Sequence, residues 1–126
     1  MTPAPHPPRK PNRLTRRAEF LQVAAKGRRA AVHGLVLQAL PRGDGAGVAA
    51  GPARLGFTVT RKVGNAVVRN RTRRRLKEAA RLYLRDHPLA GVDLVLIGRD
   101  ATRGRDFAAL MDDLHRALVK TGVVAK

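Results

Sequence analysis

No cysteine occurs among the 126 residues, which excludes disulfide bonds, thiolate zinc sites and a thiol nucleophile. Tryptophan is absent as well, and the aromatic side chains are three phenylalanines and one tyrosine. A chain of this length has material for one hydrophobic core. We therefore expect a single domain that packing alone stabilises.

Long apolar runs are also missing. No stretch of the sequence approaches the ~18 apolar residues of a membrane span, and the first ten residues, MTPAPHPPRK, lack the apolar segment of a secretory signal. These features predict a cytoplasmic protein without a membrane partner. A basic surface can bind an anionic membrane, but such binding usually uses an amphipathic helix with aromatic or leucine anchors, and aromatic residues are few here.

Acidic residues are scarce, because 9 Asp and Glu stand against 26 Lys and Arg, giving a formal net charge of +17. Such an excess makes the compact state repel itself unless an anionic partner neutralises it, so nucleic acid is the expected partner. A metal-dependent nuclease would need clustered carboxylates. The adjacent Asp112 and Asp113 point in different directions from a helix, and we expect both to be surface residues. The histidines stand singly: His6, His33, His87 and His115.

The pattern of apolar residues predicts an α+β domain over residues 9–126, preceded by a disordered proline-rich arm over residues 1–8. Helices are predicted over 15–26, 67–84 and 106–119, and strands over 35–40, 54–60 and 92–97. Thr15 is the expected N-cap of the first helix, and Gly27 follows its end. A loose surface connection is expected over 43–52.

The strand over 54–60 has two different faces. Its apolar residues alternate with small or polar ones, so that Leu55, Phe57 and Val59 share one face and Gly56, Thr58 and Thr60 the other. The apolar face is expected in the core. The small, polar face would let a flexible ligand lie close to the backbone, although a solvated outer face is the more common arrangement.

The helix over 67–84 is basic on the side away from its core stripe, which comprises Val68, Thr72, Leu76, Ala79 and Tyr83. Arg69, Arg73 and Lys77 follow one another at intervals of four residues, with Glu78 as the compensating acid. Like charges at this spacing destabilise an isolated helix by a few tenths of a kcal/mol per pair, which favours an external anion.

Folded RNA is the expected ligand of this helix, because guanidinium groups bind phosphate oxygens bidentately. Two alternatives are a solvated charged face and readout of a DNA major groove, although no helix-turn-helix spacing accompanies the helix. Just before the helix, Gly64 permits an unusual backbone angle and Asn65 can cap, so backbone amides there can add an anion site.

The run from Gly56 to Arg71, GFTVTRKVGNAVVRNR, closely resembles the signature of the bacterial ribonuclease P protein family, including its Arg-Asn-Arg core. Asn12-Arg13-Leu14 with Glu19-Phe20 resembles the amino-terminal helix of that family, and residues 101–118 resemble its last helix. The resemblance covers residues 9–120.

This resemblance implies a two-layer α/β sandwich in the order αβββαβα, of the kind found in the second domain of a small-subunit ribosomal protein. Its βαβ crossover would be left-handed, against the general right-handed rule. The resemblance also implies a subunit of ribonuclease P, an endoribonuclease that removes the 5′ leader of precursor tRNA. Its RNA subunit would hold the catalytic Mg²⁺ ions, and the protein would bind that RNA and the leader, without a catalytic or metal-binding residue of its own.

The family's binding residues carry over position by position. Contacts to the catalytic RNA fall on Lys62, Asn65, Arg69, Asn70, Arg71, Arg73, Arg74 and Lys77. Contacts to the leader fall on Arg16, Phe20, Val23, Gln38 and Thr58. Relatives often carry further aromatic residues where this chain has Ala24 and Gln38, and Phe20 has plain core packing as its alternative role. The alternative function is that of a ribosomal protein or RNA chaperone with no associated reaction. Only the motif resemblance argues against this alternative.

Overall fold

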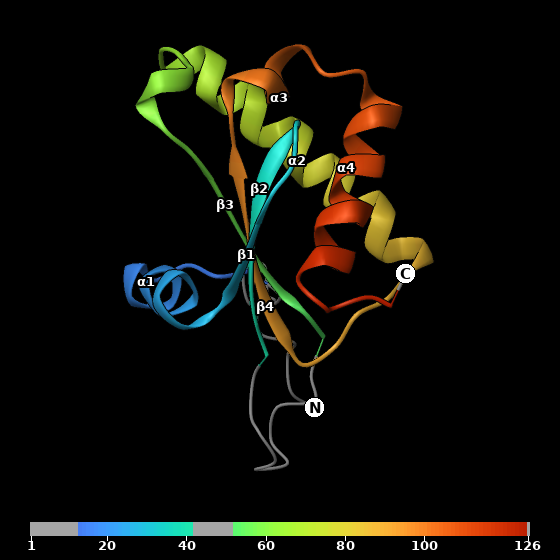
Figure 1. Cartoon of the computed structure of the whole chain (residues 1–126). Helices are drawn as coiled ribbons and strands as arrows, with labels where there is room; N and C mark the ends of the chain where they lie inside the picture. Colours follow the sequence, from blue (N-terminus) through green and yellow to red (C-terminus); the bar gives the residue numbers. More distant parts are fainter. Residues whose placement is uncertain (1–12, 42–51, 126) are drawn as a thin grey trace, which may run out of the picture.

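The computed structural model describes residues 13–41 and 52–125. The predicted proline-rich arm and most of the connection predicted over 43–52 lie outside these residues. The described part is a four-stranded sheet with helices on both faces (Figure 1). Its class is the predicted α+β arrangement.

The sheet contains β1 (Arg28–Ala31), β2 (Leu35–Pro41), β3 (Arg54–Val59) and β4 (Val92–Gly98) in the order β1-β2-β4-β3. β2 pairs antiparallel with both β1 and β4, whereas β3 and β4 are parallel neighbours. The three strands predicted from residue patterns are confirmed. β1 was not found from its own sequence, RRAA, because it has few strand-forming residues and is held by its pairing with β2.

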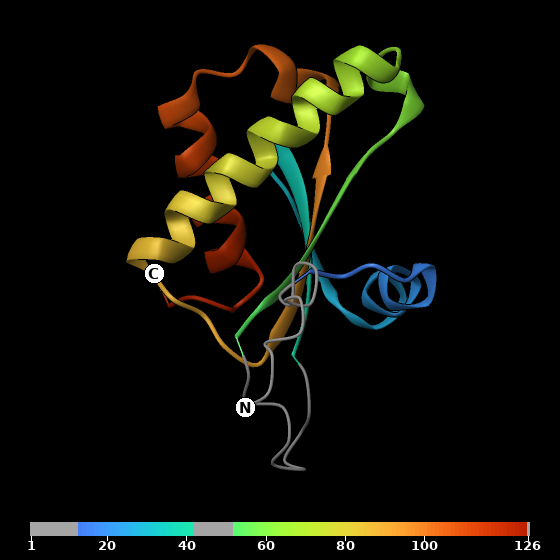
Figure 2. The ribbon, with the colours of Figure 1, turned by 180° about the vertical axis from the view of Figure 1, so that it is seen from behind.

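One helix covers one face of the sheet and two long helices cover the other (Figures 1 and 2). α1 (Arg17–Lys26) lies alone on its face, opposite α2 (Ala66–Asp86) and α4 (Phe107–Lys120). The short helices η1 (Arg61–Val63) and α3 (Asp100–Gly104) precede α2 and α4. Apart from these two turns, the element order is the expected αβββαβα, with α2 connecting the parallel strands β3 and β4.

The start of α1 differs from the prediction. The helix begins at Arg17 with Arg16 as its N-cap, so the expected cap at Thr15 is wrong. The reason is Glu19, whose Oε1 accepts the backbone N–H groups of Thr15 and Arg16, both at 3.0 Å. At the other end the prediction is confirmed, because Gly27 follows the helix and its N–H donates to the carbonyl of Val23.

The main core lies between the sheet and the pair α2 and α4. Thr72, Leu76, Ala79 and Tyr83 of α2 are buried there and Val68 is half-buried, which confirms the predicted core stripe. The Thr72 hydroxyl donates to the carbonyl of Val68 at 2.8 Å, which satisfies it inside this core. The predicted apolar face of β3, comprising Leu55, Phe57 and Val59, also packs against it.

Asp113 is a buried residue, so its predicted surface position is wrong. Its side chain is 1% exposed and accepts two hydrogen bonds from the guanidinium of Arg105, at 2.8 and 3.1 Å. These bonds raise the pKa of Arg105, which stays charged. A side chain at Gly34 would collide with the Asp113 carboxylate, so the turn between β1 and β2 needs glycine here. The ion pair therefore joins α4 to the segment that follows α3.

Candidate nucleic-acid interface

The turn before α2 is fixed by two side chains of the family motif. The side-chain oxygen of Asn65 accepts the N–H of Val68 at 3.0 Å, which confirms it as the N-cap. Arg69 Nη1 donates to the carbonyl of Gly64 at 3.1 Å, and Gly64 has a φ of 157°. Asn65 and Arg69 therefore shape the start of the helix, in addition to any contact with a ligand.

The side of α2 away from the core carries the arginine face, which we define as Arg69, Arg71, Arg73 and Arg74. Arg71 and Arg74 are exposed, Arg69 and Arg73 are half-buried, and none of the four forms an ion pair within residues 13–41 and 52–125. Asn70 is exposed and accepts a hydrogen bond from Arg73 at 2.8 Å. Lys77 is half-buried further along the helix.

The acid expected to compensate these charges is engaged elsewhere. Glu78 pairs with Arg81, whose Nη2 lies 2.6 Å from Oε2 and whose hydrogen bonds lower the pKa of Glu78. Arg81 lies seven residues, about two turns, beyond Arg74 on α2. The arginine face therefore keeps its positive charge.

The opposite face of the sheet brings together the residues predicted for the leader. Gln38 of β2 and Thr58 of β3 are half-buried there, and Phe20 of α1 covers Gly56 so closely that a Cβ at this glycine would lie 2.6 Å from the ring. Phe20 is half-buried, so its ring is partly accessible. Arg16 is exposed at the start of α1. The predicted set thus lies on one face of the molecule.

Val23 differs from the other residues predicted for the leader, because it is 1% exposed and packs with Leu14 and Val95 under α1. A side chain buried to this degree packs α1 against the sheet and has no exposed surface for a ligand. Phe20 packs at the edge of the same cluster. Ala24, where relatives often have an aromatic residue, is exposed.

α1 is attached to the sheet by a bridge that the sequence analysis missed. Arg54 of β3 donates to both oxygens of the buried Asp93 at 2.9 and 2.8 Å and to Glu19 of α1 at 3.1 Å. The backbone N–H groups of Arg16 and Thr15, together with Arg54, lower the pKa of Glu19. A lone acid inside the apolar run of β4 was the available signal, since a buried carboxylate needs a partner.

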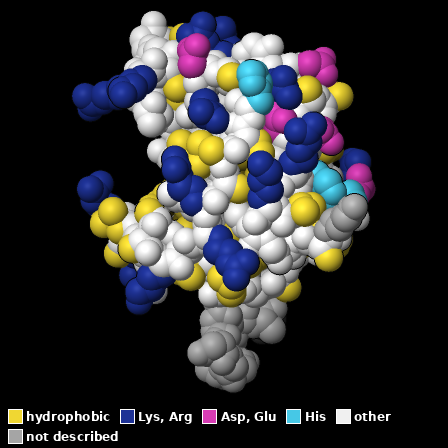
Figure 3. All heavy atoms as spheres, viewed as in Figure 1, with side chains coloured by type: hydrophobic (Ala, Val, Ile, Leu, Met, Phe, Trp, Pro, Cys, Tyr) yellow, Lys and Arg dark blue, Asp and Glu magenta, His cyan; other side chains and the backbone are white. Residues whose placement is uncertain are grey.

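A groove continues along this sheet face beyond α1. Its floor includes Val36 and Ile97, and its rim carries Arg29, Lys62 and Arg99. Figure 3 shows the outline indented above α1, with apolar surface bordered by Lys and Arg, while the visible acids lie toward the top and right of the view. The acid in the lining of the groove is Asp100 of α3. Lys62, predicted to contact the catalytic RNA, therefore lies beside the groove instead of on the arginine face. We call this hollow the sheet-face groove.

Among the described residues, no group of three or more His, Asp or Glu side chains could hold a metal ion. His115 is bound through Nδ1 to the Tyr83 hydroxyl at 2.9 Å, and Tyr83 stacks on His87 with ring centroids 4.5 Å apart. No helix in the described part of the chain is long and apolar enough to cross a membrane.

Comparison with known proteins points to one family. The family described as Ribonuclease P matches residues 9–122, which fall within the predicted domain. The ribonuclease P protein component of Gluconacetobacter diazotrophicus is 66% identical over 112 residues, covering 89% of this chain and 92% of that protein. Among solved structures, a mutant RNase P protein of Staphylococcus aureus has a TM-score of 0.71 at 25% identity, with 90% of each chain covered. The RNase P protein of Thermotoga maritima has a TM-score of 0.62 at 27% identity, covering 82% of this chain and 92% of that one.

Proposed function

The chain belongs to the ribonuclease P protein family, whose members are subunits of a tRNA-processing ribonucleoprotein, and we propose that it binds two RNAs on two faces. The arginine face of α2 binds the catalytic RNA. The sheet-face groove, together with Phe20 of α1 over the same face of the sheet, binds the single-stranded 5′ leader of precursor tRNA. The protein thus presents the leader to an active site on the RNA subunit.

The observation that carries the first role is the positive charge of the arginine face. Four arginines lie within six residues of one helix without an ion pair in the described part of the chain, and Glu78 is bound by Arg81. Guanidinium groups without an acidic partner bind phosphate well. Helix α2 holds these four in a fixed array that a folded RNA backbone can match. Family membership disfavours a ribosomal protein or RNA chaperone without a reaction.

The second role rests on the chemistry of the groove. Proteins bind single strands by combining a basic channel with stacking surfaces. Here an apolar floor of Val36 and Ile97 lies below a rim with Arg29 and Arg99, and Phe20 offers a half-buried ring. A single-stranded leader could place bases on the floor and phosphates at the rim.

Magnesium belongs to the RNA subunit in this proposal, because the described carboxylates do not cluster. Mg²⁺ prefers oxygen ligands and is commonly held by carboxylates and phosphates. Asp93 and Asp113 are each bound to an arginine, so neither suits a metal. The contribution of the protein is to bind and orient the substrate.

Phe20→Ala tests the leader site. We expect the reconstituted holoenzyme to bind precursor tRNA about tenfold more weakly, with binding of mature tRNA unchanged, because stacking contributes about 1–3 kcal/mol per base. The measurement is the ratio of the two dissociation constants. Leu21→Ala is the matched control, since Leu21 is 53% exposed on the same helix. An unchanged ratio combined with a lower unfolding temperature would assign Phe20 to core packing instead.

A further inference from the structure

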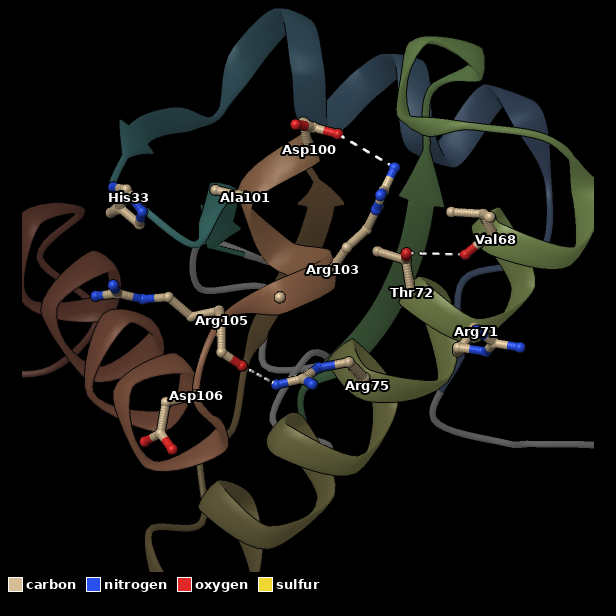
Figure 4. A pocket seen from close by; sticks show the side chains of 11 residues that line it. His33, Val68, Arg71, Thr72, Arg75, Asp100, Ala101, Arg103, Arg105 and Asp106 are labelled. Carbon is tan, nitrogen blue, oxygen red and sulfur yellow. Dashed lines mark hydrogen bonds and ion pairs between the residues drawn. The ribbon is translucent and has the colours of Figure 1, made fainter.

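A second hollow lies on the helix side of the molecule, between α2 and α3. It is lined by Arg71, Thr72 and Arg75 of α2 and by Arg103 and Gly104 of α3, among others. Figure 4 shows Arg75 and Arg103 reaching from these two helices to opposite ends of the hollow, with Arg71 at its outer edge. We call it the helix pocket. Arg71 connects it to the arginine face.

Arg75 is held in the helix pocket by contacts that leave part of its guanidinium group unused. Its Nη2 donates to the backbone carbonyl of Arg105, and its Cζ lies 5.9 Å from the centre of the Phe107 ring. Its Nε is buried and has no hydrogen-bond partner among the described residues. A buried donor without a partner is costly, so a small shift of the side chain toward an anion in the pocket would gain a hydrogen bond.

Arg103 is oriented from the opposite helix. Its Nη1 donates to the carbonyl of Val63 at 3.0 Å. Its ion pair with Asp100 is 3.5 Å long, and the Asp100 side chain is 82% exposed, so this pair neutralises little of the charge. The main chain of η1 thus fixes the guanidinium while leaving it available for a ligand.

The acids near the helix pocket do not cancel these charges. Asp106, which lines it, accepts the N–H of Ala109 at 3.2 Å as the N-cap of α4. Figure 4 shows Asp106 pointing away from the hollow. Arg105, also in the lining, is committed to the buried Asp113. Arg75 and Arg103, at the two ends of the hollow, remain as cations without a buried carboxylate partner among the described residues.

We propose that the helix pocket binds the backbone of the catalytic RNA, with Arg75 and Arg103 each contacting phosphate. This inference rests on the proposed function, because the pocket is continuous with the arginine face through Arg71. The RNA strand bound to α2 then turns onto α3. Phosphate is the indicated ligand because two guanidinium groups, each oriented by a backbone carbonyl on a different element, present several N–H donors to phosphate oxygens.

The test uses the full-length protein and its catalytic RNA, with Arg75→Gln and Arg103→Gln made singly. Each change should weaken binding about fivefold at about 0.15 M salt and lower the slope of log affinity against log salt by roughly one unit, the value of one lost phosphate contact. Arg116→Gln is the matched control, since Arg116 is exposed on α4 and pairs with Asp112. It removes the same charge and should leave the slope unchanged.

A second measurement needs no RNA. Inorganic phosphate added to the free protein should shift the Nε–H resonance of Arg75 in a ¹H–¹⁵N spectrum, and Arg103→Gln should weaken that shift. Because Arg103 is on the surface of a short helix, its variant keeps the test valid even where Arg75→Gln unfolds.

The helix pocket can be disproved without disproving the proposed function. The helix pocket would be overturned as a phosphate site if the Arg75 resonance did not shift on addition of phosphate and if Arg75→Gln and Arg103→Gln had the same salt slope as Arg116→Gln. The proposed function would survive that result if variants of the arginine face still weakened binding. Loss of effect in both sets of variants would overturn the proposed function itself.

Discussion

Replacing Arg73 and Arg74 together by glutamine is expected to weaken binding of the catalytic RNA about 20-fold at about 0.15 M salt. The change should also lower the salt slope by about two units, because each lost phosphate contact removes close to one. Both residues are on the arginine face and neither has an ion pair within the described ranges. Arg69 is the poorer choice because it also holds Gly64. Dissociation constants measured over a salt series check this prediction.

The matched control is the pair Arg85→Gln and Arg116→Gln. These side chains are 63% and 62% exposed, at the far end of α2 and on α4, and removing them lowers the net charge by the same amount. Equal losses in the two double variants would show diffuse attraction without a defined face. A slope that neither variant changes would mean that the arginine face is only solvated.

Arg105→Ala is expected to lower the free energy of unfolding by about 3 kcal/mol, the low end for breaking a buried ion pair, since Arg105 itself is partly exposed. The change would leave the carboxylate of Asp113, 1% exposed, without its two charged hydrogen bonds. Urea unfolding measures the loss. Adding Asp113→Asn should recover part of it, because a neutral amide is less costly to bury than an unpaired charge.

Arg116→Ala provides the comparison for this ion pair. It breaks the neighbouring pair with Asp112, in which both side chains are about 60% exposed, and such pairs contribute about 0.2–1 kcal/mol. The two acids are adjacent in the sequence and differ mainly in burial. Similar losses in Arg105→Ala and Arg116→Ala would show that Asp113 finds another partner or water, and that the buried pair does not fix α4.

The sequence predicted those features that depend on residues near one another in the chain. The helical spacing of Leu76 and Tyr83 located the core stripe of α2, and the alternation in β3 assigned Phe57 and Gly56 to opposite faces. The motif around Asn65 located the start of the helix. Local periodicity and capping chemistry suffice to predict such features, because they depend only on residues within one helix or strand.

Features that depend on distant partners could not be found in this way. Asp93 and Arg54 are 39 residues apart and meet because β3 and β4 are paired, so their bridge to α1 needed the register of the sheet. Arg75 reaches a carbonyl 30 residues away, and only the approach of α3 makes it part of a pocket. Asp113 looked like an ordinary surface acid because its partner Arg105 lies eight residues earlier, before α4 begins, and only the packing of α4 buries the carboxylate.

The most direct test of the account is cleavage of precursor tRNA in Mg²⁺ at moderate salt by three samples: the catalytic RNA, the protein, and both together. The account predicts no cleavage by the protein alone, and a higher kcat/KM for the mixture than for the RNA alone. The gain should shrink when the leader is cut to a single nucleotide, because the sheet-face groove then has little to bind. Cleavage by the protein alone, or a mixture no faster than the RNA, would contradict the account.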